Sequence, residues 1–401
     1  MRAHVGRAST PVNDSALMGT YRRLPVAFER GSGPWLTTSD GRQVLDALSG
    51  IAVCGLGHAH PRVAEAVAQQ AATLVHTSNL YEIPLQAQLA ERLCALAGMD
   101  RAFFGNSGAE ANEAAIKLAR LHGHGRGITT PTIVVADGAF HGRTLATLTA
   151  TGNAAAQAGF GPLLDGFLRV PYGDLDALDA ATRDREDIVA VLVEPVQGEG
   201  GVVVPPQDYL PGLRARCDAH DWLLMLDEVQ TGAGRTGRLF AFQHHAGLAP
   251  DVVTLAKGIA NGVPIGACLA RGAAASVLGP GTHGSTFGGN PLAAAAALAT
   301  LDAIAEDDLC ARAEALGERI RRGLAEILAG DNRVREIRGA GLMIGVEFVD
   351  PVPELVMRAL EADLLVNVTA TNVLRLLPPL VLSDAEADEI VERLRRILGD
   401  R

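Results

Sequence analysis

The chain has 401 residues, and its 48% hydrophobic and 20% charged content is typical of a globular, water-soluble protein with two or three packed lobes. Its formal net charge of −11 argues against a nucleic-acid partner, because no basic stripe offsets the repulsion of phosphates. Five widely spaced cysteines without a Cys-x-x-Cys pair indicate reduced thiols of a cytoplasmic protein, not a disulfide framework or a metal site.

Neither the N-terminal residues nor the alanine-rich stretch that ends at residue 301 indicates export or membrane insertion. Residues 1–11 are polar and lack the apolar core of a secretory signal. The alanine-rich stretch 292–301 is too short to span a bilayer, and it follows Asn290 and Pro291, which predict the start of a buried helix. We therefore expect no membrane partner.

The predicted elements divide the chain into three parts. Residues 1–70 carry turn signals at 31–34 and 39–41 between short strands, and we expect this segment to join a small domain. Residues 71–300 should form the large domain and residues 301–401 a small C-terminal α+β domain. The latter has helical patterns at 309–328 and 384–398 with strand-like segments at 341–348 and 373–377.

The large domain contains short apolar runs that lack strict alternation, as buried parallel strands do. These runs occupy residues 132–136, 188–193, 222–226, 252–256 and 265–270. Helical patterns at 110–122 and 210–220 lie between some of them, which predicts an α/β sheet covered by helices on both faces.

Lysine is rare in this chain, since only Lys117 and Lys257 occur beside 33 arginines. Lys117 lies within the predicted helix 110–122, where a surface position is expected. Lys257 ends the apolar run 252–256, where a charge is costly unless it has a task. Lysine, unlike arginine, can lose its proton when desolvated and condense with a carbonyl. The alternative is an amine that merely extends to solvent from a strand end.

The helix 110–122 is preceded by the sequence NSGAEAN at residues 106–112. Ser107 and Glu110 have the spacing of a capping box. Gly108 permits close approach of a ligand to the backbone, and the free N–H groups at the start of the helix favour an anion such as phosphate. The alternative is an ordinary capped helix that binds no ligand, because such a helix could start with the same sequence.

Further polar residues follow other predicted strands. Asp227 directly follows the apolar run 222–226, at the sheet edge where ligands bind. Its carboxylate could keep a pyridine nitrogen protonated, or it could simply cap a loop. Phe140 and Arg143 could stack on a planar cofactor and clamp a carboxylate, or be a core aromatic and a solvated cation. Glycine-rich loops at 194–201 and 284–291 carry Glu199 and the pair Ser285 and Thr286.

Taken together, these motifs resemble the class III (ω-amino) aminotransferases of pyridoxal-phosphate fold type I. The resemblance runs from YRRLPVAFERG at 21–31 to LRLLPP at 374–379, and its most specific parts are DEVQTG at 227–232 and the Lys257 segment. It implies an α/β fold in which helices sandwich a mostly parallel central sheet. A small α+β domain built from both chain ends would complete it.

The resemblance also implies how pyridoxal 5′-phosphate would be held. Lys257 would bind it covalently and move the substrate proton, and Asp227 would pair with the pyridinium nitrogen. Gln230 would contact the phenolic oxygen and Phe140 would stack on the ring, while the phosphate would meet Ser107, Gly108 and Ala109. Thr286 would reach the phosphate in the neighbouring subunit, which implies a homodimer.

The substrate residues implied by the family bind carboxylates. Arg143 would hold the α-carboxylate of the amine donor, and Arg375 that of 2-oxoglutarate. Glu199 would pair with Arg375 while the donor is bound and swing away for the dicarboxylate, because an unpaired buried guanidinium is costly. The other implied substrate contacts are Ser285, Tyr21 and Ile51.

Within the family, four segments resemble the acetylornithine subgroup: SGIAVCGLGHAHP at 49–61, HTSNLY at 76–81, GRTG at 234–237 and LVNVT at 365–369. The ornithine enzymes carry a tyrosine where this chain has Ile51, and an apolar residue suits an acylated nitrogen better. N2-acetylornithine and 2-oxoglutarate (or glutamate) are therefore the expected substrates, in arginine biosynthesis. Succinylornithine, N-succinyl-diaminopimelate and 4-aminobutyrate are the alternatives.

Two alternatives come from other classes of protein. A nicotinamide dehydrogenase could be built on the same type of α/β sheet, but the chain lacks a Gly-x-Gly-x-x-Gly turn directly after the first strand. A non-catalytic pyridoxal-phosphate-binding module is the other alternative, and the sequence shows no DNA-binding extension that would favour it.

Overall fold

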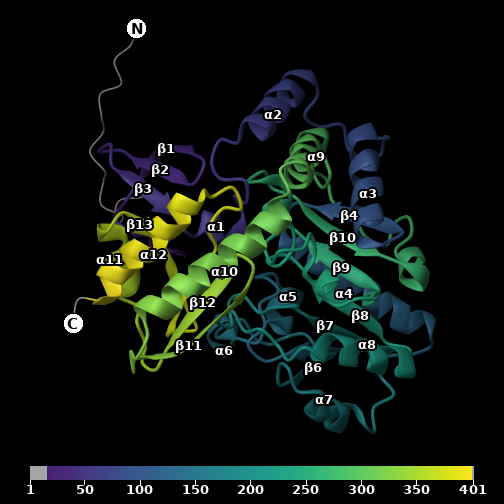
Figure 1. The fold of residues 1–401 in the computed structure, drawn as a ribbon. Coiled ribbons are helices and arrows are strands. Elements are labelled where there is room, and N and C mark those ends of the chain that lie inside the picture. Colours follow the sequence, from purple (N-terminus) through teal and green to yellow (C-terminus); the bar gives the residue numbers. More distant parts are fainter. Residues whose placement is uncertain (1–15, 400–401) are drawn as a thin grey trace.

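The computed structural model describes residues 16–399. Residues 1–11, for which the sequence predicts no secretory signal, lie outside the described part. Three sheets make up the fold, one of seven strands and two of four. In Figure 1 the large sheet and its helices lie on the right, and the two smaller sheets lie on the left near both chain ends.

The central sheet has the strand order β4-β10-β9-β8-β7-β5-β6. The bounds are β4 Arg101–Gly105, β5 Thr132–Ala136, β6 Phe167–Val170, β7 Ile188–Val193, β8 Leu223–Asp227, β9 Val252–Leu255 and β10 Gly266–Ala270. All pairs from β9 to β6 are parallel, which confirms the predicted mostly parallel α/β sheet. The edge strands β4 and β6 were not predicted.

One prediction about this sheet is wrong. We expected residues 265–270 to form a parallel strand, but β10 runs antiparallel to both β9 and β4. Only residues 256–265 lie between β9 and β10, and a parallel connection needs a crossover of a dozen or more residues. The short connection therefore forces the chain to reverse direction.

Helices cover both faces of the central sheet, because successive strand residues point to opposite sides. Helix α4 packs with Ile133, Val135 and Met225 on one face. Helix α8 packs with Val134 and Leu224 on the other. The helices of this part are α2 Pro61–Thr73, α3 Pro84–Ala97, α4 Gly108–Gly125, α5 Leu145–Ala150, α6 Ala154–Gln157, α7 Leu175–Thr182, α8 Tyr209–His220 and α9 Pro291–Glu306, with short 3₁₀ turns η2 Ala241–His244, η3 Lys257–Ala260 and η4 Gly272–Ser276.

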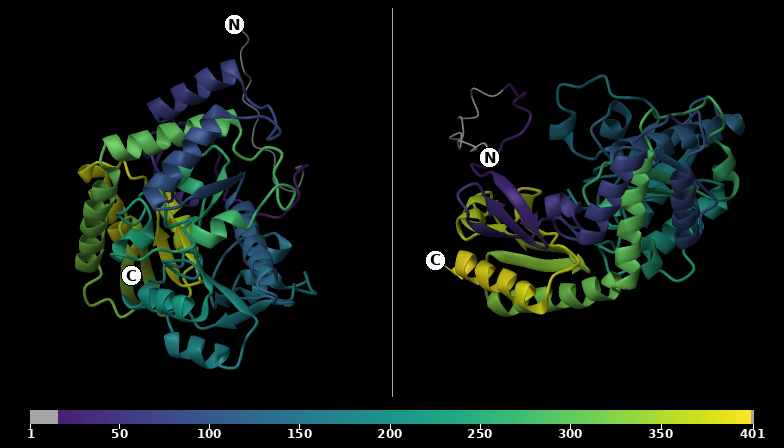
Figure 2. Two further views of the ribbon diagram at one scale, coloured as in Figure 1. Left: turned by 90° about the vertical axis from the view of Figure 1, so that its right-hand side faces the viewer. Right: turned by 90° about the horizontal axis from the view of Figure 1, so that it is seen from above.

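The two smaller sheets join the chain ends. One has the order β1-β2-β3-β13 and the other β11-β12-β15-β14. Their strands are β1 Phe28–Ser32, β2 Trp35–Thr38, β3 Gln43–Asp46, β11 Val334–Ala340, β12 Met343–Phe348, β13 Leu364–Leu365, β14 Asn367–Thr369 and β15 Val373–Leu376, and helices α10 Leu309–Ile327, α11 Leu355–Glu361 and α12 Asp384–Gly399 pack beside them. Because β13 pairs in parallel with β3, both ends contribute to one lobe, which Figure 2 shows as purple and yellow segments side by side.

One element departs from ordinary helix geometry. Element α1, Ser49–Ala52, has positive φ angles at all four residues: 52° at Ser49, 62° at Gly50, 67° at Ile51 and 61° at Ala52. It is a single left-handed turn, which costs L-residues roughly 1–2 kcal/mol each. A β-branched residue such as Ile51 is especially rare in this conformation.

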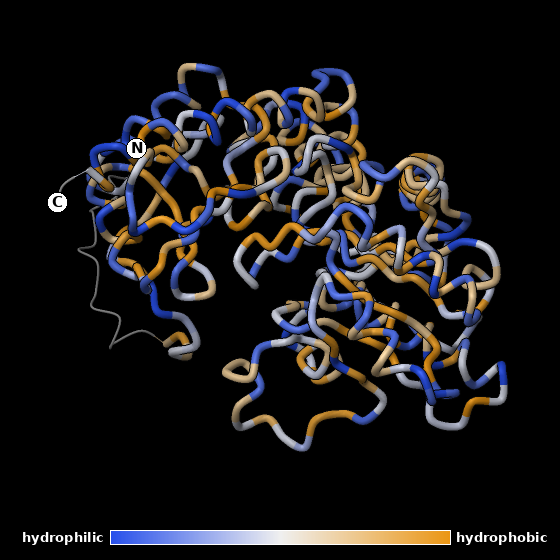
Figure 3. The backbone as a smooth tube through the Cα atoms, turned by 60° about the horizontal axis from the view of Figure 1, so that its bottom comes forward, coloured by the Kyte–Doolittle hydropathy of each residue, from blue (hydrophilic) through white to orange (hydrophobic). Residues whose placement is uncertain are grey.

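Apolar side chains fill the interior of both lobes. In Figure 3 hydrophobic stretches follow the strands through the interior, and hydrophilic stretches gather at the outer turns. The alanine-rich helix α9 begins at Pro291 and is capped by the Asn290 side chain, as predicted. Within residues 16–399, every helix is too short or too polar to cross a bilayer.

Candidate active site

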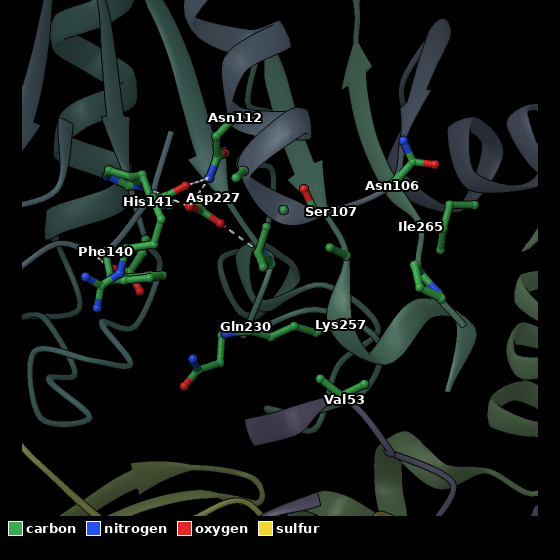
Figure 4. A pocket seen from close by; sticks show the side chains of 18 of the residues that line it. Val53, Asn106, Ser107, Asn112, Phe140, His141, Asp227, Gln230, Lys257 and Ile265 are labelled. Atoms are coloured by element: carbon green, nitrogen blue, oxygen red, sulfur yellow. Dashed lines mark hydrogen bonds and ion pairs between the residues drawn. The ribbon is translucent and has the colours of Figure 1, made fainter. Parts of the chain in front are cut away.

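A cavity of about 420 Å³ opens at the carboxyl ends of the parallel strands of the central sheet. Of the residues predicted from sequence, its wall contains Ser107, Gly108, Ala109, Phe140, Arg143, Asp227, Gln230 and Lys257. These residues come from the ends of β4, β5, β8 and β9 and the start of α4, so the sheet topology alone brings them together (Figure 4).

Asp227, at the end of β8, has a carboxylate that three hydrogen bonds hold in place. Its Oδ2 meets Asn112 Nδ2 and His141 Nδ1, each at 2.7 Å, and its Oδ1 accepts the Val229 N–H at 3.0 Å. Only 3% of this residue is exposed. Figure 4 shows the three side chains converging at one wall. A carboxylate fixed in this way can pair with a protonated ring nitrogen in the cavity.

Asn112 and His141 were missed by the sequence analysis as site residues. Asn112 ends the segment 106–112 quoted above, and His141 stands between the predicted residues Phe140 and Arg143, so the available signal was their position in the sequence. Asn112 itself is held by Thr254, whose hydroxyl donates to Asn112 Oδ1 at 2.6 Å. Three separate elements thus orient the Asp227 carboxylate.

Lys257 lies just past β9, in the left-handed region with φ 41°, and its side chain extends into the cavity toward Gln230 (Figure 4). Burial lowers the pKa of its amine below the ordinary 10.5, while Glu199 opposes that shift. Among residues 16–399, no group hydrogen-bonds to this amine. An amine that is shielded, unpaired and easier to deprotonate is suited to attack a carbonyl.

The start of α4 forms a second wall. The Ser107 hydroxyl accepts the Glu110 N–H at 3.2 Å, and the Asn106 amide nitrogen is bonded to the Glu110 carboxylate. The N–H groups of Gly108 and Ala109 belong to the free first turn of the helix and line the cavity. A side chain at position 108 would collide with Val229 at 2.7 Å, so glycine is also required here for packing.

Phe140 is held by a buried carboxylate that was likewise missed. Glu194, at the end of β7, accepts the N–H of Phe140 at 3.0 Å and that of Gly198 at 3.1 Å. Burial raises the pKa of Glu194 above its ordinary value. On the open side of the ring, the Arg143 guanidinium carbon stands 5.6 Å from the Phe140 centroid. Glu194 therefore ties the aromatic loop to the loop that carries Glu199.

Arg375 and Glu199 form an ion pair next to the wall residue Gln230. Arg375 is fully buried, and its Nη1 donates to Glu199 Oε1 at 2.7 Å and to Gln230 Oε1 at 3.3 Å. Burial alone would raise the pKa of Glu199, but the charge and hydrogen bond of Arg375, together with Lys257 and Gln230, lower the net pKa below its ordinary value. Among the described residues, Arg375 Nη2 finds no hydrogen-bond acceptor. The pair therefore leaves one buried donor free for a further anion.

Six predicted residues lie outside the cavity wall: Arg375 and Glu199, which pair beside Gln230, and Ser285, Ile51, Thr286 and Tyr21. Ser285 contacts the wall through a hydrogen bond, since its hydroxyl is 3.2 Å from Nδ2 of the wall residue Asn106. Ile51 is partly exposed beside the wall residue Val53. Thr286 and Tyr21 are exposed and contribute nothing to the wall in this chain.

The surface lysine also has defined contacts. Lys117 Nζ donates to Thr282 O at 2.9 Å and meets His283 Nδ1 at 3.0 Å. It is exposed, as expected, but it ties α4 to the loop that carries Ser285 and Thr286.

Comparisons with known proteins agree with this geometry. Residues 18–398 match the family model of class-III aminotransferases. An acetylornithine aminotransferase of Nitrosomonas europaea is 56% identical over 96% of this chain and 98% of its own length. An ornithine aminotransferase of Toxoplasma gondii superposes with a TM-score of 0.91 at 36% identity, covering 95% of this chain and 92% of its own. An acetylornithine aminotransferase of Elizabethkingia anophelis gives 0.86 at 34% identity, covering 96% of both chains.

The family match extends over almost the whole described chain and removes the basis for the nicotinamide dehydrogenase and the non-catalytic alternatives. The Asp227 network, the unpaired Lys257 amine and the free amides of α4 lie together at one edge of the sheet. The chain belongs to the class-III aminotransferases.

Proposed function

We propose that this chain is an N2-acetyl-L-ornithine:2-oxoglutarate 5-aminotransferase of arginine biosynthesis. Class-III aminotransferases use pyridoxal 5′-phosphate, and the relative with 56% identity is an acetylornithine aminotransferase. The main structural support is the buried Arg375, which has one guanidinium nitrogen without an acceptor among the described residues, next to a cavity that contains Lys257. A carboxylate-bearing substrate would satisfy that nitrogen.

The residues of the cavity fit the cofactor. Asp227 would pair with its ring nitrogen, Phe140 would support its ring, and Gln230 would contact its phenolic oxygen. The α4 start with Ser107, Gly108 and Ala109 would hold its phosphate. When bound, pyridoxal phosphate supplies an electron sink for the carbon next to the reacting amine.

Lys257 has two roles in this proposal. Its lowered pKa favours the neutral amine that can bind the cofactor covalently. When it is free, this amine would be the group placed to take the proton from the substrate carbon and return it elsewhere. Burial of the cavity floor keeps water from competing for that proton.

The arginines would sort the two substrates by their carboxylates. Arg143, at the cavity wall, would bind the α-carboxylate of the donor and leave its terminal amine at Lys257. Arg375 would bind the α-carboxylate of 2-oxoglutarate after Glu199 moves aside. Ser285, Tyr21 and the apolar Ile51 would complete the donor site, and an acylated nitrogen suits Ile51 because it carries no charge to desolvate.

We also propose a homodimer in which Thr286 completes the neighbouring site. Thr286 is exposed and absent from its own cavity wall. Two apolar side chains near it are exposed, Leu80 by 87% and Phe287 by 60%, and Asn79 ties the segment of Leu80 to this loop by donating to the Ser285 carbonyl at 2.9 Å. A second copy of the chain would cover this surface. Sedimentation of the purified protein as a monomer at micromolar concentration would contradict the dimer.

The division into an N-terminal segment 1–70, a large domain 71–300 and a small domain 301–401 is likewise our proposal. It is supported by the central sheet, whose strands lie between Arg101 and Ala270. A cytoplasmic location is proposed because the five cysteines are free thiols.

Steady-state kinetics with competing donors tests the activity. We expect kcat/KM for N2-acetylornithine, with 2-oxoglutarate as acceptor, to exceed that for ornithine and 4-aminobutyrate by at least about tenfold, a difference of about 1.4 kcal/mol. Succinylornithine and N-succinyl-diaminopimelate should follow more closely, since both carry an acylated nitrogen. A preference for free ornithine would reject the assignment.

A further inference from the structure

The left-handed turn α1, Ser49–Ala52, is sterically costly and yet stands next to the cavity. Val53, the residue after it, lines the cavity and lies opposite Asp227 in Figure 4. Backbone strain of this kind persists only where the surrounding structure holds it, and it gathers at functional sites. Contacts from outside the turn hold it in this conformation.

Two side chains fix the start of the turn. The Asp46 carboxylate accepts the N–H groups of Leu48 and Ser49 through one oxygen, each at 2.8 Å. The buried Ser49 hydroxyl donates to the carbonyl of Leu377 at 2.7 Å. In return, the Leu377 N–H donates to Ala47 O at 2.8 Å. The turn and the end of β15 are therefore bonded to each other in both directions.

The end of β15 is held from a second side. Leu377 follows the strand that carries Arg375, and the next residue, Pro378, accepts a hydrogen bond from the buried guanidinium of Arg235. A change in the turn would therefore be transmitted to the backbone two residues from Arg375, and Arg235 limits how far that backbone can move.

The last residue of the turn contacts two other site segments. Ala52 packs with Val196 and Val202, which flank Glu199 in its loop. Its carbonyl oxygen faces Gly258, where a Cβ would come within 3.4 Å, directly after Lys257. The turn thus touches the segments of Glu199, Lys257 and Arg375 while it presents Ile51 beside the cavity.

We propose that Ser49 is a positioning residue of this site, because it anchors the left-handed turn 49–52 to Leu377 and so sets where Ile51 stands. The left-handed backbone directs Ile51 toward the substituent on the donor's α-nitrogen, and Ser49 keeps it there by anchoring the turn to Leu377. Ser49 acts through Ile51 and touches neither substrate nor cofactor. This inference rests on the proposed function for the identity of the donor.

The kinetic test compares Ser49→Ala with Thr182→Ala. Thr182 is also buried, and its hydroxyl also donates to a backbone carbonyl, that of Leu178 at 2.8 Å, but it lies in α7. The measured quantity is the ratio of kcat/KM for N2-acetylornithine to kcat/KM for ornithine. We expect Ser49→Ala to shift this ratio about fivefold toward one, as loss of one buried hydrogen bond allows. Thr182→Ala should leave the ratio unchanged.

A purely structural role for Ser49 would lower both kcat/KM values equally, and that outcome would overturn the inference. The wild-type ratio alone decides the proposed function, because it shows which donor is preferred. The shift of the ratio in Ser49→Ala decides the role of the turn, whichever donor the wild type prefers. The proposed function and the role of the turn can therefore be rejected independently of each other.

A second measurement tests the left-handed backbone in solution, without activity. Ile51→Gly and Ile51→Ala both remove the side chain beyond Cβ and differ only in the Cβ methyl, so the difference in their Tm reports the backbone conformation. We expect the glycine variant to melt higher, because glycine adopts positive φ without strain. At the exposed Glu318 of the right-handed helix α10, the order should reverse and Glu318→Gly should melt below Glu318→Ala. If the glycine variant melted below the alanine variant at position 51 as well as at position 318, that result would contradict the left-handed turn.

Discussion

The two sides of the cavity are built differently. On the sheet side, Asp227, Phe140 and Lys257 follow the ends of ordinary parallel strands, and each lies where the chain direction places it. On the small-lobe side, Ile51 sits on a strained left-handed turn, and Arg375 is buried with Glu199. We therefore expect the sheet side to carry the chemistry shared by the family and the small-lobe side to set the choice of substrate.

The largest effect expected from this division is on the sheet side. Lys257→Arg keeps a positive charge but removes the amine that binds carbonyls and moves protons, so kcat should fall by about 10³-fold or more. Lys117→Arg is the matched control, and its exposed contacts allow a change of at most about fivefold. A Lys257→Arg enzyme that keeps a tenth of its kcat would assign the chemistry to another residue.

Asp227→Asn should give the next largest loss. The amide cannot hold a proton on a ring nitrogen by charge, and we expect kcat to fall by about 10²- to 10³-fold with both donors. Asn112→Ala removes only one of the groups that orient Asp227 and should cost about tenfold. Steady-state rates of both variants test this order, and a reversed order would show that Asn112 does more than hold Asp227.

On the small-lobe side, Glu199→Gln should separate the two substrates. It removes the charge that neutralises Arg375, which leaves a buried guanidinium unpaired whenever the donor is bound. We expect kcat/KM for the donor to fall about tenfold and KM for 2-oxoglutarate to fall or stay constant. An equal loss for both substrates would mean that Glu199 only supports its loop.

The smallest predicted effect concerns stability and pH. The hydrogen bond to Asp46 raises the pKa of His58 from 6.5 to about 9, at 2.8 Å from the carboxylate that anchors the turn. A raised histidine pKa stabilises the folded state fully below pH 6.5, and this contribution is lost as the pH rises through about 9. The Tm of the wild type should therefore exceed that of His58→Gln by about 2 °C near pH 6 and converge with it near pH 10. A constant difference across that range would show that His58 stabilises by packing alone.

The sequence predicts the sheet side well for a physical reason. A buried strand shows as an apolar run, and the residue after it must lie at the ligand-binding edge, so Asp227 and Lys257 could be placed from local patterns. The orientation of β10 could not be placed in this way, because it depends on the length of the connection after β9.

The rest of the site depends on contacts between distant segments. Asn112 and His141 become site residues only where α4 and the loop after β5 meet Asp227, which lies 86 positions beyond His141. The left-handed turn has no local signature either, since Ser49, Ile51 and Ala52 have no preference for positive φ. It forms because Asp46 and Leu377 bind it, 328 positions apart in the case of Ser49 and Leu377.

The scarcity of lysine has a practical consequence. With one amine on the outer surface of α4 and one inside the cavity, reductive methylation with ¹³C-formaldehyde would introduce at most two lysine methyl signals in a chain of 401 residues. Each signal would be assigned by a single substitution. The Lys117 resonance would report on the loop that it binds and the Lys257 resonance on access to the cavity, so spectra of the intact protein could follow both without a crystal.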